Sequence, residues 1–183
     1  PDRRTSSGAR PRVRAVTLFD LPEDQATASP VRDARDSVRV RLVVAYDGSG
    51  FHGFAVNRGV RTVGGLLTEA LQTVLGHPVE ITCAGRTDKG VHARAQVVTF
   101  DAAAGRVDPV ALGKSLNALC GPDVAVTDVA LVADDFDARF SATARRYRYR
   151  VLNRPAPDPF RSRYAWHVDE ELSWPALVLA CDA

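Results

Sequence analysis

The chain of 183 residues carries a net charge of +2 and is 45% hydrophobic and 25% charged, which is typical of a globular protein with one core. No apolar run is long enough to span a bilayer, and the Arg-rich N-terminus lacks the hydrophobic segment of a secretory signal. The three cysteines are widely separated and form no C-x-x-C pair. We therefore expect a cytoplasmic protein with reduced thiols, without a disulfide framework or a zinc site.

The first half of the chain predicts a strand, a loop and a helix. Residues 1–37 show little periodicity and are expected to form a flexible N-terminal extension. Apolar and polar residues alternate over residues 38–44, as in a half-buried strand. A Gly-rich loop follows at residues 47–53, without the Gly-Lys-Ser/Thr ending of a P-loop. Thr62 is expected to cap a helix that ends at Gly76.

The second half predicts two further strands, a second helix and two more strands. The strands are expected at residues 79–83, 96–101, 124–132 and 146–152, and Asp108-Pro109 opens a helix that runs to about residue 119. The resulting order is strand, helix, strand, strand, helix, strand. That order predicts an α+β fold of the ferredoxin-like type, an antiparallel sheet with its helices on one face.

A single aspartate stands out in the loop between the second and third strands. Residues 85–92 read GRTDKGVH, so Asp88 is bracketed by Gly85 and Gly90. Glycines permit the tight turns that hold one carboxylate at a loop tip, as a nucleophile or a base requires. Arg86 can pair with Asp88 and keep it ionised. On spacing alone, an ordinary tight turn with a surface Arg–Asp pair explains the pattern equally well.

Arginine is concentrated near the C-terminal end of the chain. Residues 139–163 contain eight arginines against one acid, Asp158. Arginine pairs with phosphate and stacks on bases, so the segment suits nucleic acid, although a solvated charged face is the simpler alternative. Tyrosines and arginines alternate from Arg146 to Arg150, so a strand there would have an aromatic face and a basic face. From this pattern alone, Tyr147 is expected to be a core residue and not a ligand contact.

Four segments in order resemble the tRNA pseudouridine synthase A family. They are residues 43–53 (VVAYDGSGFHG), 85–92 (GRTDKGVH), 115–126 (SLNALCGPDVAV) and 135–149 (DFDARFSATARRYRY). The resemblance covers about two thirds of the chain, from about residue 40 to about residue 160. The chain departs from the usual pattern at Phe54-Ala55, at Gly64 and at Lys89, which puts details of RNA contact in question.

The resemblance implies an enzyme that isomerises uridine to pseudouridine in the anticodon stem-loop of tRNA. It implies a homodimer that uses no cofactor, with Asp88 as the catalytic residue and with Tyr147 and Arg86 binding the substrate. His52 and His92 lie far apart without other candidate ligands, so no metal is expected. Further RNA contacts are expected from Lys89, His92, His52, Arg145, Arg146 and Arg148.

The chain is expected to divide into the extension at residues 1–37, a catalytic domain at residues 38–165 and the start of an incomplete second domain at residues 166–183. Ser173 resembles an N-cap, and the apolar residues after it resemble the first turns of a helix. Members of the family continue into a second half, so the chain is expected to be truncated. This keeps open a catalytically silent RNA-binding module, and a phosphate-binding enzyme that uses residues 47–53 is a further alternative.

Overall fold

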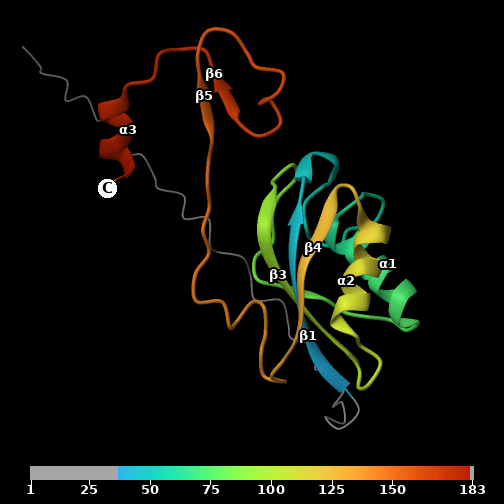
Figure 1. Cartoon of the computed structure of the whole chain (residues 1–183). Coiled ribbons are helices and arrows are strands. Elements are labelled where there is room, and N and C mark those ends of the chain that lie inside the picture. Colours follow the sequence, from blue (N-terminus) through green and yellow to red (C-terminus); the bar gives the residue numbers. More distant parts are fainter. Residues whose placement is uncertain (1–36, 182–183) are drawn as a thin grey trace, which may run out of the picture. The chain divides into compact units, whose positions relative to one another are not determined.

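The computed structural model describes residues 37–181 and contains the two helices and four strands that the first two thirds of the sequence predict (Figure 1). All but one of the residues of the expected N-terminal extension lie outside the described residues. The elements follow the order β1 (Ser37–Tyr46), η1 (Gly48–Gly50), α1 (Val63–Leu75), β2 (Thr82–Cys83), β3 (Ala93–Ala103), α2 (Pro109–Cys120), β4 (Val124–Val132), β5 (Val151–Asn153), β6 (Trp166–Val168) and α3 (Trp174–Cys181).

The first four strands form one antiparallel sheet in the order β2-β3-β1-β4. The central strand β1 pairs with β3 on one side and with β4 on the other, so that Val40 lies between Phe100 and Leu131. The connections through α1 and α2 link strands that are not neighbours in the sheet. This topology confirms the predicted ferredoxin-like α+β fold.

The two helices begin and end at the predicted caps. The Thr62 hydroxyl accepts the Gly65 N–H at 3.1 Å, and Gly76 ends α1 in the left-handed conformation with φ of 73°. The Asp108 carboxylate accepts two N–H groups of the first turn of α2. Leu67 and Leu71 of α1 are fully buried in the core. Figure 1 shows α1 and α2 on the same side of the sheet. The helices on one face are therefore confirmed.

Two predicted strands are wrong in extent. Only Thr82–Cys83 of the predicted strand at residues 79–83 pairs with β3, because Val79 packs into the core without a backbone partner. Residues 146–150 form no strand, and β5 pairs only with β6, in a separate parallel pair. A strand needs the backbone of a neighbour, and residues 146–149 have no such partner among the described strands, whereas the Arg150 carbonyl accepts the Trp166 N–H of β6 at 2.8 Å. The predicted two-faced strand of tyrosines and arginines is therefore an extended segment without a ladder.

The predicted helix after Ser173 is present as α3, where the Leu177 N–H donates to the Ser173 carbonyl at 3.1 Å. Its apolar side chains are largely exposed: Trp174 is 73% and Leu179 is 75% exposed. In the part of the chain that the structure describes, no helix has the length and apolar character needed to cross a membrane. The predicted domain boundary at residue 165 stays a prediction.

Candidate active site

Residues 84–92, here called the Asp88 loop, join β2 to β3 at the end of the sheet. The loop is fixed at its start by the buried side chain of Gln96 on β3, which accepts the Gly85 N–H at 3.3 Å and donates to the Gly85 carbonyl. The Ala84 N–H also donates to the Val97 carbonyl at 2.9 Å. Asp88 itself is exposed. The fold therefore presents one accessible carboxylate on a loop whose base belongs to the sheet.

A second loop, residues 47–54, holds the Asp88 loop from the side. The Phe54 N–H donates to the Thr87 carbonyl at 2.9 Å, and the Gly90 N–H donates to the Phe51 carbonyl at 3.3 Å. The Thr87 hydroxyl also forms a hydrogen bond with the buried Tyr46 hydroxyl at 2.8 Å, and burial raises the pKa of Tyr46. These contacts involve residues before and after Asp88. They constrain the backbone at Asp88 and leave its side chain exposed.

Two glycines allow this close approach. A Cβ on Gly48 would lie 2.0 Å from the Val91 carbonyl oxygen, which is closer than Cβ atoms come to a non-bonded neighbour. Gly53 has a φ of 94°, in the left-handed region, and a Cβ there would lie 2.7 Å from the Thr87 carbonyl oxygen. The Gly-rich character of residues 47–53 therefore serves the contact with the Asp88 loop, and a phosphate cradle is not needed to explain it.

His92 closes the far end of the Asp88 loop. Its Nδ1 accepts the Gly48 N–H at 3.1 Å, and its Nε2 lies 2.8 Å from the Arg163 carbonyl oxygen. Nδ1 also lies 3.1 Å from Asp47 Oδ1. His92 therefore joins three segments of backbone, and both of its ring nitrogens have protein partners.

Asp47 and Tyr164 extend this cluster, and neither was predicted as a site residue. Tyr164 donates its hydroxyl to Asp47 Oδ2 at 2.8 Å, and its ring lies 5.0 Å from that of His92. Hydrogen bonds from Ser49 hold the pKa of Asp47 well below its ordinary value, and the bond to Asp47 raises the pKa of Tyr164. Asp47 could have been found from the Tyr-Asp-Gly motif, whereas no local pattern singles out Tyr164.

The other predicted site residues of these loops are exposed, except for His92, which is half-buried. Arg86, Lys89 and His52 all present their side chains to solvent. Among the described residues, no ion pair within 4.0 Å joins Arg86 to Asp88. Arg86 instead acts on Cys83, where its charge partly offsets the burial that raises the pKa of the thiol. Arg86 and Asp88 are two residues apart in the sequence, but their side chains do not form the expected ion pair.

Residues 142–150, here called the Tyr147 segment, reach the start of the Asp88 loop. Tyr147 is 70% exposed and is not a core residue of the described chain. A Cβ built on Gly85 would lie 3.8 Å from the Tyr147 hydroxyl oxygen and 3.5 Å from Arg145 Nε. The structure therefore brings Tyr147 and Arg145 to the same glycine, three residues before Asp88. Arg146 and Arg148 are exposed.

The departures at residues 54 and 64 have packing roles. Phe54 is 3% exposed, and its ring centroid lies 6.2 Å from that of Tyr46. The Gly64 N–H donates to the Phe54 carbonyl at 2.8 Å, and a Cβ at Gly64 would lie 2.6 Å from that oxygen. Lys89, by contrast, is exposed at the tip of the Asp88 loop.

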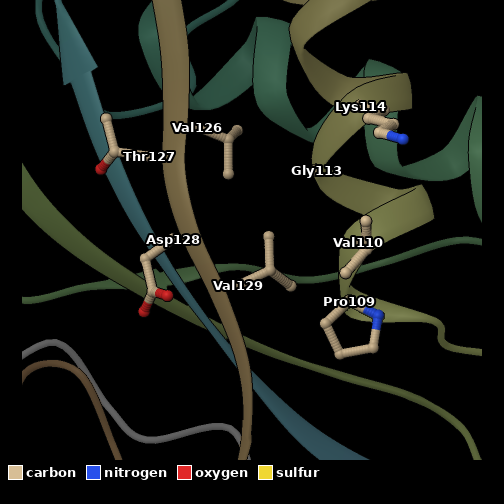
Figure 2. Close-up of a pocket in the computed structure, with 8 residues that line it drawn as sticks. All are labelled: Pro109, Val110, Gly113, Lys114, Val126, Thr127, Asp128 and Val129. Atoms are coloured by element: carbon tan, nitrogen blue, oxygen red, sulfur yellow. The ribbon is translucent and has the colours of Figure 1, made fainter.

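A shallow groove between α2 and β4 shares no residue with the Asp88 loop (Figure 2). In Figure 2, Val126 and Val129 point from β4 toward α2, whereas Thr127 and Asp128 point away from it. A Cβ at Gly113 would lie 3.3 Å from a Val129 methyl group, so the helix packs closely here. The groove is a packing seam. A second hollow, of about 410 Å³, is lined by Asp47, Ser49, Gly50, Asp123 and Arg163 and so lies at the loop that follows β1.

No group of three or more His, Cys, Asp or Glu side chains within residues 37–181 is placed to hold a metal ion. The expectation that no metal takes part in the chemistry stays a prediction.

Comparison with known proteins gives a consistent result. A family model described as tRNA pseudouridine synthase matches residues 42–141, which include the whole Asp88 loop but end before Arg145 and Tyr147. The chain is 49% identical over 133 residues to tRNA pseudouridine synthase A of Solidesulfovibrio magneticus, covering 71% of this chain and 48% of the relative. Identity to the protein of the same name from Coxiella burnetii is 45% over 130 residues, covering 70% of this chain and 49% of that protein.

A third relative, tRNA pseudouridine synthase A of a Methylobacterium species, is 47% identical over 144 residues, covering 78% of this chain and 57% of that protein. The chain therefore spans about half the length of the curated relatives it matches.

Proposed function

Because the chain belongs to the tRNA pseudouridine synthase family, we propose that its protein isomerises uridine to pseudouridine in tRNA, with Asp88 as the catalytic carboxylate. The observation that carries this proposal is the setting of Asp88. The carboxylate is exposed, while Thr87 and Gly90 on either side of it are hydrogen-bonded to residues 51–54. A reacting group needs this combination of access and fixed position.

The reaction breaks the N1–C1′ bond of uridine, turns the uracil and joins C5 to C1′, and the proton on C5 is then lost to a base. Product and substrate have the same composition, so the reaction requires neither an oxidant nor a cofactor. Asp88 would act as the nucleophile at C1′ or as the base in a glycal route. Both routes need an ionised carboxylate within reach of the ribose, and the exposure of Asp88 supports either one.

The remaining parts of the proposal concern the RNA. A uridine must leave its stack to reach Asp88, and the exposed ring of Tyr147 beside Gly85 is suited to stack on the base. Arg86 would bind the substrate, and Lys89, His52, Arg146 and Arg148 would contact the backbone of the RNA. We include the anticodon stem-loop as the target, a homodimer as the assembly and the cytoplasm as the location.

The test is tritium release from tRNA labelled at C5 of uridine, with the full gene product that contains this chain. Asp88→Asn keeps the shape and removes the charge, so tRNA should bind as before while release falls below detection. Asp134→Asn makes the same chemical change at an exposed aspartate outside the loop and should release tritium at the unchanged rate. Wild-type rates in Asp88→Asn would refute the role of Asp88. Salt-sensitive tRNA binding with no release from the unaltered protein would instead support the catalytically silent RNA-binding module.

A further inference from the structure

Arg145 belongs to the arginine-rich segment, yet its guanidinium group faces the protein. Nε donates to the Ala84 carbonyl at 2.8 Å, and Nη2 donates to the Arg139 carbonyl at 3.0 Å. Ala84 is the first residue of the Asp88 loop, and Arg139 lies in the turn that precedes the Tyr147 segment. A planar fork that serves two carbonyls fixes direction as well as distance.

We propose that Arg145 is a positioning residue that holds Tyr147 against the Asp88 loop, and that it is not one of the phosphate contacts. The proposal rests on the proposed roles of Asp88 and Tyr147. It replaces the RNA contact expected for Arg145 from the sequence, because two of its donors are already committed to backbone carbonyls.

The segment that Arg145 holds is anchored upstream. Ala138 is 2% exposed, and its N–H donates to the hydroxyl of Thr99, a buried residue of β3, at 3.2 Å. The Asp137 carboxylate accepts the N–H groups of Arg139 and Phe140, and the Ser141 N–H donates to the Asp137 carbonyl at 2.8 Å. The chain therefore leaves the sheet through a fixed turn, and the Arg139 carbonyl that receives Arg145 has a defined position.

Downstream of that turn, the Arg145 side chain bonds residues 142–150 to the Asp88 loop through the Ala84 carbonyl. Residues 142–150 form no ladder, and Tyr147 has no hydrogen bond within the described residues. Arg145 and Tyr147 both lie over Gly85, where an added Cβ would be 3.6 Å from Arg145 Cδ and 3.8 Å from the Tyr147 hydroxyl oxygen. Without the Nε bond to Ala84, no hydrogen bond among the described residues would join residues 142–150 to the Asp88 loop.

The neighbouring arginines make a matched comparison. Arg148 comes from the same segment and is exposed, and it makes no side-chain hydrogen bond or ion pair within residues 37–181. Arg145→Gln and Arg148→Gln each remove one positive charge from the segment. If both arginines only attracted phosphate, the two changes would be equivalent in tRNA binding and in its dependence on salt.

The first experiment measures kcat, KM and tRNA affinity against salt for both variants in the full gene product. For Arg145→Gln, we expect kcat to fall about 100-fold, the order seen when a reacting group is displaced by about 1 Å, with tRNA affinity unchanged. For Arg148→Gln, we expect weaker binding and a salt slope reduced by about one, with kcat retained. Arg145→Lys keeps the charge but cannot span both carbonyls, so it should resemble Arg145→Gln. Recovery of wild-type behaviour in Arg145→Lys, or a loss confined to affinity in Arg145→Gln, would overturn the proposal.

The second experiment does not depend on activity. Brief treatment of the folded protein with trypsin is followed by mass spectrometry at Arg148. Release of the segment in Arg145→Gln should raise the rate of cleavage there severalfold, whereas Arg146→Gln, which removes an adjacent arginine without these bonds, should leave it unchanged. Equal rates in both variants would refute the clamp. A protein that makes no pseudouridine but shows this difference would refute the proposed function alone.

Discussion

Gly48 offers the sharpest test of how the Asp88 loop is held. Its N–H donates to His92, and its α-carbon lies against the backbone of Gly90 and Val91. In Gly48→Ala, the new Cβ would lie 2.0 Å from the Val91 carbonyl oxygen and 2.5 Å from its carbonyl carbon. Both atoms belong to the backbone, so no side chain can rotate away to relieve the contact.

The size of the disturbance follows from this distance. A real Cβ needs at least 3.0 Å to such an atom, so residues 90–91 or residue 48 must move by about 1 Å. Overpacking of this kind costs about 1–3 kcal/mol of unfolding free energy. If the proposed function holds, a shift of about 1 Å in the loop that carries Asp88 is expected to reduce kcat about 100-fold.

The assay combines urea denaturation with tritium release from labelled tRNA. Gly50→Ala is the matched control, because it adds the same methyl group to the same loop but meets only the end of the Arg61 side chain, at 3.3 Å. We expect Gly50→Ala to stay within about 0.5 kcal/mol of the wild type. If Gly48→Ala proved as stable and as active as Gly50→Ala, the inferred contact between the two loops would be refuted.

Three further predictions concern other parts of the structure. Asn117 on α2 donates to the Val126 carbonyl and accepts the Val126 N–H on the outer edge of β4; Asn117→Ala should lower the free energy of unfolding by about 1–3 kcal/mol, and an unchanged urea midpoint would contradict this. Removing the charge in Arg86→Gln disfavours the thiolate, so the pKa of Cys83 should rise further and the pH profile of its alkylation should move upward; an unmoved profile would place Arg86 elsewhere. Because Tyr147 is 70% exposed, Tyr147→Ala should cost less than about 1 kcal/mol of stability, against the ~3–5 kcal/mol of a truncated core aromatic, while tritium release is lost.

The sequence by itself determined the elements of the sheet and its two helices. Their signals are local: Thr62 and Asp108 bond to N–H groups two or three residues away, and Gly76 supplies the left-handed conformation that ends α1. The alternation along β1 reports burial of one face, which follows from the pleat of a strand. The order of these elements leaves few topologies, and the ferredoxin-like arrangement is the one found.

The loop around Asp88 was also recognisable from its sequence, because its glycines and charged residues are contiguous. Its partners were not. The contacts from Gly48, Phe51 and Phe54 join segments about 40 residues apart, and a pattern within one segment carries no information about which other backbone lies against it. The same reasoning explains why Tyr164 was missed.

Only the tertiary structure decided the fate of the arginine-rich segment. Alternating tyrosines and arginines suit an extended chain, but a strand requires a neighbour, and residues 146–149 have none among the described strands. Arg145 and Arg148 are the same residue type and lie three positions apart in the sequence. They differ because the carbonyls of Ala84 and Arg139 lie within reach of one guanidinium group and not the other, which is a fact of three-dimensional position.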